Sequence, residues 1–286
     1  MTKKMVAAYG ISVALLLVSI WCGISIGSVS VPISTLWDAE SNPTAYSILW
    51  NIRMPRVILA ALVGAALAIA GAAFQGLLKN PLADPYTLGI SSGASVGAVF
   101  TLFFGVSLPV FGFFTLPIFS MIGAFVTLVV VMGFARLVDR TLKMETLILT
   151  GVIFSSFLGS CISLMIALTG EELRSIMGWL LGSVSMRGWP YVKMILPFVI
   201  IGALILWLHR RELNAMIYGE ERAKYLGVDV KRSKYIILIG GSMLTGAAVA
   251  VSGTIGFVGL VVPHMVRMIL GADHRHLLII SFLNGA

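Results

Sequence analysis

The apolar residues of this chain gather in long runs that are separated by short polar segments. A helix that crosses a membrane needs roughly 20 predominantly apolar residues, and runs of this length are typical of such helices. The pattern predicts eight complete spans and the beginning of a ninth near Leu277. The eight spans cover residues 5–27, 55–78, 89–105, 110–138, 146–168, 190–208, 235–253 and 256–270. We therefore expect an all-α, polytopic helical membrane protein.

Both ends of the chain lie in or beside apolar runs. The first run, from Met5 to about Gly27, is longer than the apolar part of a secretory signal peptide, so we interpret it as a retained helix. The last run stops at Ala286, partway through the predicted ninth span. A half-helix that ended in lipid would leave backbone groups without hydrogen-bond partners. We expect residues 1–286 to form a single transmembrane domain whose C-terminal end is missing.

The composition supports the same interpretation. Hydrophobic residues make up 58% of the chain and charged residues only 11%, whereas soluble domains carry about 25% charged residues. The mean hydropathy is +1.00. A soluble domain of this size could not bury so much apolar surface, so lipid is the expected solvent of most of the chain.

The distribution of basic residues predicts the orientation. With the N-terminus in the cytoplasm, 15 of the 20 Lys and Arg residues fall on the inner side, as the positive-inside rule requires. The formal net charge of +8 is therefore explained by membrane topology, and no nucleic-acid partner is needed. We expect a multi-pass protein of the cytoplasmic membrane with a cytoplasmic N-terminus.

Two segments of the chain resemble each other. Residues 64–71 read GAALAIAG and residues 246–253 read GAAVAVSG, and they fall in the second and seventh predicted spans. Spans that are five apart cross the membrane in opposite directions, which is typical of the inverted repeats of transporters. Small residues at this spacing also simply let helices pack closely, and the sequence leaves both interpretations open.

The longest polar stretch is a predicted cytoplasmic insert at about residues 209–234. Within it, residues 220–226 combine helix-forming residues with acidic groups first and basic groups later, which suits the helix dipole. Gly219 and Gly227 stand where the chain would turn before and after this helix. We expect a short amphipathic helix at the membrane surface, with Leu226 and Val228 making apolar contacts, and interpret it as a docking element; a solvated connector is the alternative.

Six strings, in order along the chain, carry a resemblance to a known family. They are RMPR at 53–56, QGLLKNPLADP at 75–85, LGISSGA at 88–94, GEERAKYLGV at 219–228, GFVGLVVPHMVR at 256–267 and GADHRHLL at 271–278. Together they resemble the FecCD family, the permeases of iron–siderophore, haem and cobalamin ABC importers. The resemblance runs from about Arg53 to Ala286. It implies ten transmembrane helices, a pore of two permease subunits, a cytoplasmic ATPase dimer and an external solute-binding protein.

The resemblance also implies roles for particular residues. Arg53 and Arg56 open the second span and would dock the binding protein through salt bridges, although interfacial snorkelling is the alternative. The residues that would couple to the ATPase are Gly219, Glu220, Arg222, Ala223, Leu226, Gly227 and Val228. Polar residues near the inner end of the second span would line the translocation pathway or hydrogen-bond across helices. These are Gln75, Asn80, Ser91 and Ser92, with Asp84 beside them.

Other chemistry finds little support in the sequence. No P-loop string occurs, so energy must come from a partner ATPase or from an ion gradient. H-E-x-x-H does not occur, and G-x-S-x-G occurs only within apolar runs, at 23–27 and 89–93, where serines more often bond to the backbone. An intramembrane hydrolase is therefore not favoured. His264, His274 and His276 lack the convergent ligands of a metal site, and we expect the last two to lie in a solvated turn. We therefore predict a transport subunit without catalytic residues, bound metal or cofactor.

The iron–siderophore complex is the expected cargo, with haem or cobalamin as alternatives and an ion-coupled secondary transporter as the rival mechanism. Deeply placed acidic residues are typical of ion-coupled carriers, and here the acids fall near the predicted span ends. The sequence specifies neither the chelate, nor the Gram type of the host, nor whether the second permease subunit is a copy of this chain.

Overall fold

The structure is a bundle of helices. The computed structural model describes residues 3–37, 40, 42–110, 112–139 and 141–286, and within them it contains no strand. Its α-helices are α1 (Lys3–Ser25), α2 (Pro43–Ser47), α3 (Met54–Leu77), α4 (Ile90–Phe103), α5 (Thr115–Val138), α6 (Met144–Leu168), α7 (Leu173–Leu180), α8 (Trp189–Leu208), α9 (Arg210–Ile217), α10 (Glu220–Tyr225), α11 (Val230–Ser252), α12 (Val258–Leu270) and α13 (His274–Gly285). Shorter turns are η1 (Ile33–Trp37), η2 (Ile48–Arg53), η3 (Pro85–Leu88) and η4 (Gly112–Phe114). The predicted all-helical polytopic architecture is confirmed for this part of the chain.

Among the described residues, six helical segments are long and apolar enough to cross a membrane. They are α1, Pro43–Leu77 around α3, Gly112–Val138 around α5, α6, α8 and α11. The predicted spans at 89–105 and 256–270 form only the shorter helices α4 and α12, of 14 and 13 residues. At about 1.5 Å per residue these helices measure roughly 20 Å, less than the ~30 Å hydrocarbon core. The number of eight complete spans therefore stays a prediction.

Both short helices follow a break in the helical backbone. Gly89, with φ of 78°, caps η3 and begins α4, and Gly253, with φ of 70°, ends α11 before the break that precedes α12. Pro85 starts η3. Proline lacks the backbone N–H that would continue a helix, and a left-handed glycine ends one, so these residues shorten the helices that the apolar pattern predicted.

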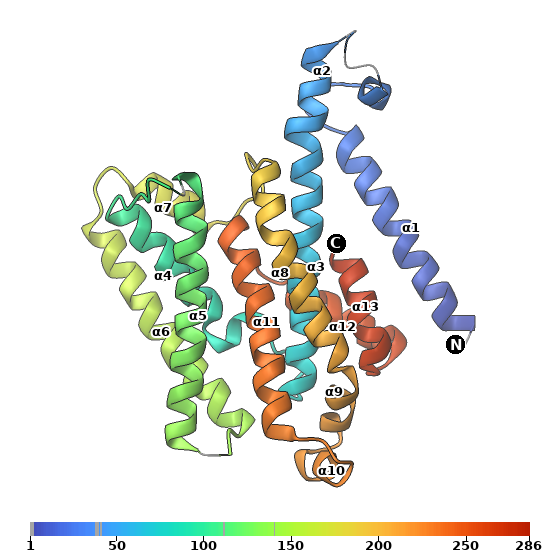
Figure 1. Cartoon of the computed structure of the whole chain (residues 1–286), viewed down its shortest axis with the longest axis vertical. Helices are drawn as coiled ribbons and strands as arrows, with labels where there is room; N and C mark the ends of the chain where they lie inside the picture. Colours follow the sequence, from blue (N-terminus) through green and yellow to red (C-terminus); the bar gives the residue numbers. More distant parts are fainter. Residues whose placement is uncertain (1–2, 38–39, 41, 111, 140) are drawn as a thin grey trace.

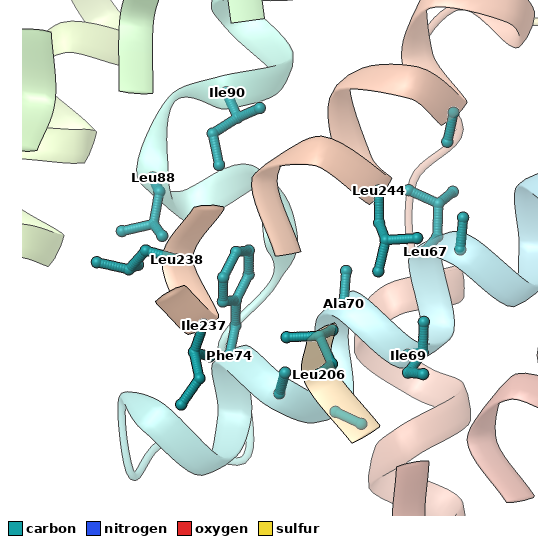
Figure 2. Close-up of a cluster of buried hydrophobic side chains, with 14 of the residues drawn as sticks. Leu67, Ile69, Ala70, Phe74, Leu88, Ile90, Leu206, Ile237, Leu238 and Leu244 are labelled. Carbon is teal, nitrogen blue, oxygen red and sulfur yellow. The ribbon is translucent and has the colours of Figure 1, made fainter. Parts of the chain in front are cut away.

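The core of the bundle is built around α3 and α11. Most of the apolar stretch of each helix is buried, 72% for α3 with its preceding turns and 78% for α11, compared with 6% for α1 and for α6. Figure 2 shows the centre of this core, where Phe74 of α3 lies close to Ile237 and Leu238 of α11, with Leu206 of α8 nearby. The small residues of the two similar segments allow this burial, because helices without bulky side chains approach closely.

The elements divide between the two ends of the bundle. In Figure 1 α9, α10 and the connection between α5 and α6 lie at the lower end, near the N-terminus of α1, whereas α2 and α7 lie at the upper end. Helix α3 descends from α2, and α11 rises from beside α10. The two similar segments therefore run in opposite directions, as the predicted inverted repeat requires, although the repeat itself stays a prediction.

Candidate functional site

The insert at the lower end folds as two short helices, α9 and α10. The chain turns into α10 at Gly219, with φ of +113°, and leaves it at Gly227, with φ of +83°. Residues with a Cβ rarely adopt these backbone angles, so the two glycines determine where the helix begins and ends. The predicted short helix is therefore present, and it ends at Tyr225.

Exposed apolar side chains stand among the charged residues at the two ends of α10. Ala223 points into the bundle and is fully buried, and Val228 packs against the core. Leu226 contributes little to these inner contacts because it is 70% exposed, next to Tyr225 at 90% and near Tyr218 at 69%. Leu226 is therefore available for apolar contacts with a partner, and its coupling role stays a prediction. Exposed apolar side chains on a polar insert are typical of an interaction surface.

The two arginines before α3 have different environments. Arg53 is only 8% exposed, and its guanidinium donates hydrogen bonds to the carbonyl oxygens of Ile24 at 3.0 Å, Ser25 at 3.1 Å and Val29. These carbonyls lie at and just beyond the C-terminus of α1, where backbone acceptors have no partner within the helix and a cation is favourable. Arg56 is exposed. Of these two arginines, therefore, only Arg56 presents its charge at the surface.

The polar residues near the lower end of α3 are held by local contacts. Gln75 is fully buried, and its Nε2 donates to the carbonyl oxygen of Leu260 in α12 at 3.0 Å. Asn80 is exposed, and its Oδ1 accepts from the backbone N–H of Leu82 at 2.9 Å, which stabilises the turn after α3. In the first turn of α4, Ser91 is buried and Ser92 is half-buried. The structure does not bring these four side chains together around one cavity.

The two breaks that precede α4 and α12 are in contact. The hydroxyl of Tyr86 in η3 donates to the carbonyl oxygen of Ile255 at 2.5 Å and accepts from the backbone N–H of the same residue at 3.2 Å. The Asp84 carboxylate caps η3 by accepting from the backbone N–H of Tyr86 at 3.0 Å. Burial raises the pKa of this carboxyl, even though that hydrogen bond opposes the shift. A polar link thus joins two irregular segments within the bundle.

The histidines near the start of α13 serve structural contacts. His274 is fully buried, and both its backbone N–H and its Nδ1 lie within hydrogen-bond distance of Asn214 Oδ1 in α9, at 2.8 and 3.0 Å. His276 Nδ1 lies 3.1 Å from the hydroxyl of Tyr9 in α1. The prediction of a solvated turn is therefore wrong for His274. Among the described residues, no three His, Cys, Asp or Glu side chains gather where they could hold a metal ion.

Asp273 completes this contact between α9 and α13. It accepts a hydrogen bond from Asn214 Nδ2 at 2.7 Å and pairs with Arg275 at 2.9 Å. Burial raises the pKa of the Asp273 carboxyl, but the hydrogen bonds from Arg275 and Asn214 outweigh it and lower the pKa well below its usual range. The carboxylate is therefore charged at neutral pH.

Sequence reasoning overlooked the surface of α6. This helix has the composition of a span, yet only 6% of that span is buried. Ser156, Ser160 and Ser163 lie on one exposed face at i, i+4 and i+7, and each hydroxyl donates to the carbonyl oxygen four residues before it at 3.0 Å. The helical spacing of these serines, together with Gly159, is the feature of the sequence that could have revealed this face. In a membrane this face must meet lipid, another subunit or a water-filled path.

Comparisons with known proteins agree with these features. The chain matches the FecCD transport family over residues 15–286. It is 60% identical to an uncharacterised ABC transporter permease, YvrB, of Bacillus subtilis, over 98% of this chain and 82% of that protein. It is 43% identical to the cobalamin import permease BtuC of Halobacterium salinarum, over 85% of this chain and 64% of that protein. It is 39% identical to the hemin transport permease HmuU of Yersinia pestis, over 92% and 78% of the two chains.

A solved structure gives the same result. An inward-facing structure, assigned to an ABC transporter of the metal-chelate type, superposes with a TM-score of 0.86 at 31% identity and covers 98% of this chain and 86% of that one. The matched relatives are permease subunits, and such subunits work with a separate ATPase. The chain therefore belongs to the FecCD transport family and is a multi-pass permease subunit of an ABC transporter.

Proposed function

We propose that this permease imports an iron(III)–siderophore complex across the cytoplasmic membrane. The family match over residues 15–286 carries the proposal, and several relatives of this chain are named for the import of metal chelates, namely cobalamin, hemin and Fe(3+) dicitrate. Among them, the permease FecD of Escherichia coli transports Fe(3+) dicitrate and is 36% identical to this chain, and the iron-uptake permease FeuC of Bacillus subtilis is 33% identical. The partners would be a second permease subunit, an ATPase dimer and an external solute-binding protein.

The lower end of the bundle would face the cytoplasm and dock on the ATPase. The positive-inside distribution supports this orientation, and the N-terminus of α1 lies toward the end of the bundle that carries α10 (Figure 1). The exposed side chains of Tyr225 and Leu226 would insert into a groove of the ATPase, while Gly219 and Gly227 fix the direction of α10. The remaining members of the coupling segment are Glu220, Arg222, Ala223 and Val228. Coupling would be mechanical, so no catalytic group is needed here.

The upper end would receive the solute-binding protein, and the two arginines would contribute differently. Arg56 is exposed and can pair with a carboxylate of the partner. Arg53 is committed to the carbonyl oxygens at the end of α1, so it would position this region rather than touch the partner. Glu in place of Arg56 should weaken binding-protein affinity at least 10-fold with no loss of thermal stability. Glu in place of Arg53 should instead lower stability, and the reverse pattern would refute the assignment.

For the pathway, Ser92 is the candidate among the four predicted side chains, since it is half-buried, Gln75 and Ser91 are buried, and the exposed Asn80 is engaged in a turn. We infer that Gln75 acts by joining α3 to α12. Replacing Ser92 with a bulky Phe should slow uptake, whereas Ala should not. Equal uptake by both variants would remove Ser92 from the pathway.

The decisive experiment is reconstitution of the chain with its ATPase in liposomes. We expect ATP-dependent uptake of ⁵⁵Fe-labelled ferrichrome only when the ATPase and the binding protein are both present. Uptake driven by an ion gradient without ATP would overturn the mechanism. Uptake of another chelate in place of ferrichrome would overturn the cargo but keep the importer.

Cobalamin is the second candidate cargo. The cobalamin permease of Halobacterium salinarum, at 43% identity, is more similar to this chain than the iron permeases at 36% and 33%. The same liposomes should therefore be offered radiolabelled cyanocobalamin in competition with ferrichrome. Preference for cyanocobalamin at equal concentration would replace the iron proposal.

A further inference from the structure

Three elements at the lower end of the bundle meet at the side chain of Lys234. This residue lies near the start of α11, and its side chain is only 1% exposed. Its Nζ lies 2.7 Å from Oε1 of Glu220, the first residue of α10. The same ammonium donates a hydrogen bond to the carbonyl oxygen of Leu142 at 2.9 Å, in the connection between α5 and α6. One buried cation thus bridges α10 to the segment that leads into α6.

The burial of Lys234 makes both contacts obligatory. A buried ammonium without a partner is strongly unfavourable, because it has lost its hydration. In the described part of the chain, no carboxylate other than that of Glu220 lies within 4 Å of Lys234. If α10 moved away, Lys234 would have to follow Glu220 or move toward water. Either movement of the Lys234 side chain would change its hydrogen bond to the carbonyl oxygen of Leu142.

The Leu142 side of the bridge is held in an uncommon conformation. Leu142 has φ of +52° and is fully buried, although left-handed backbone angles are uncommon for residues other than glycine. The neighbouring turn is stabilised by the Asp139 carboxylate, which accepts from the backbone N–H of Thr141 at 2.8 Å. Helix α6 begins at Met144, two residues after Leu142. A displacement of the Leu142 carbonyl is therefore passed directly to the first turn of α6.

We propose that Lys234 transmits the position of α10 to α6 and is a positioning residue for energy coupling. This inference rests on the proposed docking of α10 on the ATPase. It adds the contacts through which a movement of docked α10 would reach α6. The bridge differs from an ordinary surface ion pair, which contributes little because water screens it. It also differs from a stabilising contact within one element, because its three partners belong to separate segments.

The test compares Lys234→Met with Lys231→Met in the full chain bound to its ATPase in nanodiscs. Lys231 is an exposed cation near the same end of α11, so its loss controls for net charge. Hydrogen exchange of residues 141–147 is measured without nucleotide and with ATP plus vanadate. We expect ATP to change exchange at least 3-fold in the parent and in Lys231→Met, and not in Lys234→Met. An undiminished response in Lys234→Met would overturn the transmission.

A second variant separates transmission from stability. The double substitution of Lys234→Met with Glu220→Met replaces the ion pair by apolar side chains, which can restore stability. We expect this variant to unfold at the temperature of the parent and still lack the exchange response. Recovery of the response in the double variant would refute the role of the bridge. A parent that fails to bind the ATPase would instead refute the proposed function, and the transmission with it.

Discussion

Gly71→Ala tests the close approach of α3 and α12. A Cβ added at Gly71 would lie 2.6 Å from the carbonyl carbon of Gly259 and 2.9 Å from its Cα. Carbon atoms in ordinary contact are about 3.5–4.0 Å apart, so the two helices would have to separate by roughly 1 Å. Overpacking of this kind costs about 1–3 kcal/mol, and backbone cannot move aside as a flexible side chain can.

The same movement would break a hydrogen bond one turn away. Gln75 lies four residues after Gly71 on the same face of α3, and its Nε2 is 3.0 Å from the Leu260 carbonyl oxygen. A separation of roughly 1 Å would take these atoms out of hydrogen-bond range, for about 1 kcal/mol more. Ala is intrinsically more favourable than Gly in a helix, and this preference offsets about 1 kcal/mol of the destabilisation. We therefore expect a net loss of about 1–3 kcal/mol.

The assay is thermal unfolding of the purified chain in detergent, followed by the fraction that remains monodisperse on size-exclusion chromatography. A loss of this size corresponds to a Tm lower by roughly 2–10 °C. Gly10→Ala is the matched control, because a Cβ there meets no atom within 4 Å in the described structure. A Gly71→Ala variant that unfolds within about 1 °C of the parent would refute the close approach as described.

Four further predictions follow from individual contacts. Gln75→Met should lower stability by about 1 kcal/mol in the same thermal assay, because the bond between α3 and α12 is lost without a change of volume. Asn214→Ala should cost about 2 kcal/mol, because it removes hydrogen bonds to both Asp273 and the backbone N–H of His274. Asp273→Asn should unfold at a lower temperature than the parent at pH 7. That difference should shrink as the pH falls below about 4, because the lowered pKa of Asp273 gives stability that is present above the unfolded-state pKa and lost as the native carboxylate is protonated. Gly219→Ala should strain a backbone with φ of +113° and weaken ATPase binding in a pull-down with no change in membrane insertion.

The sequence predicted the long helices and the insert well, because both depend on local pattern. Apolar runs of sufficient length specify spans wherever nothing interrupts them, as in α6 and α11. Gly219 and Gly227 marked the ends of α10 because only glycine adopts their backbone angles readily. The predicted bounds of α4 and α12 lie within two residues of the observed ones, but the apolar run alone does not show that these helices, of 14 and 13 residues, are shorter than the hydrocarbon core is thick.

The candidate site was harder to predict, because the environment of a side chain depends on distant segments. Arg53 has the sequence position of a surface cation, yet the end of α1 covers it. His274 stands among basic and polar residues, yet Asn214 of α9, sixty residues away in sequence, places it inside the bundle. Lys234 looks like part of a charged loop, and only the tertiary structure shows that its ammonium is enclosed. The charge pattern predicts which residues lie on the cytoplasmic side, whereas the tertiary structure determines which of those charges are accessible.

The serines of α6 give that helix a surface that tolerates two solvents. Each of the hydroxyls of Ser156, Ser160 and Ser163 is satisfied by a carbonyl of its own helix, so none of them demands a partner when the surface is dry. The same hydroxyls keep spare acceptor positions that water can occupy when the surface is wet. Wetting and drying such a wall changes its free energy little. A permease whose interior alternately takes up and loses water needs a lining of this kind. A purely apolar lining would oppose the entry of water, and a polar lining without internal hydrogen bonds would oppose its loss.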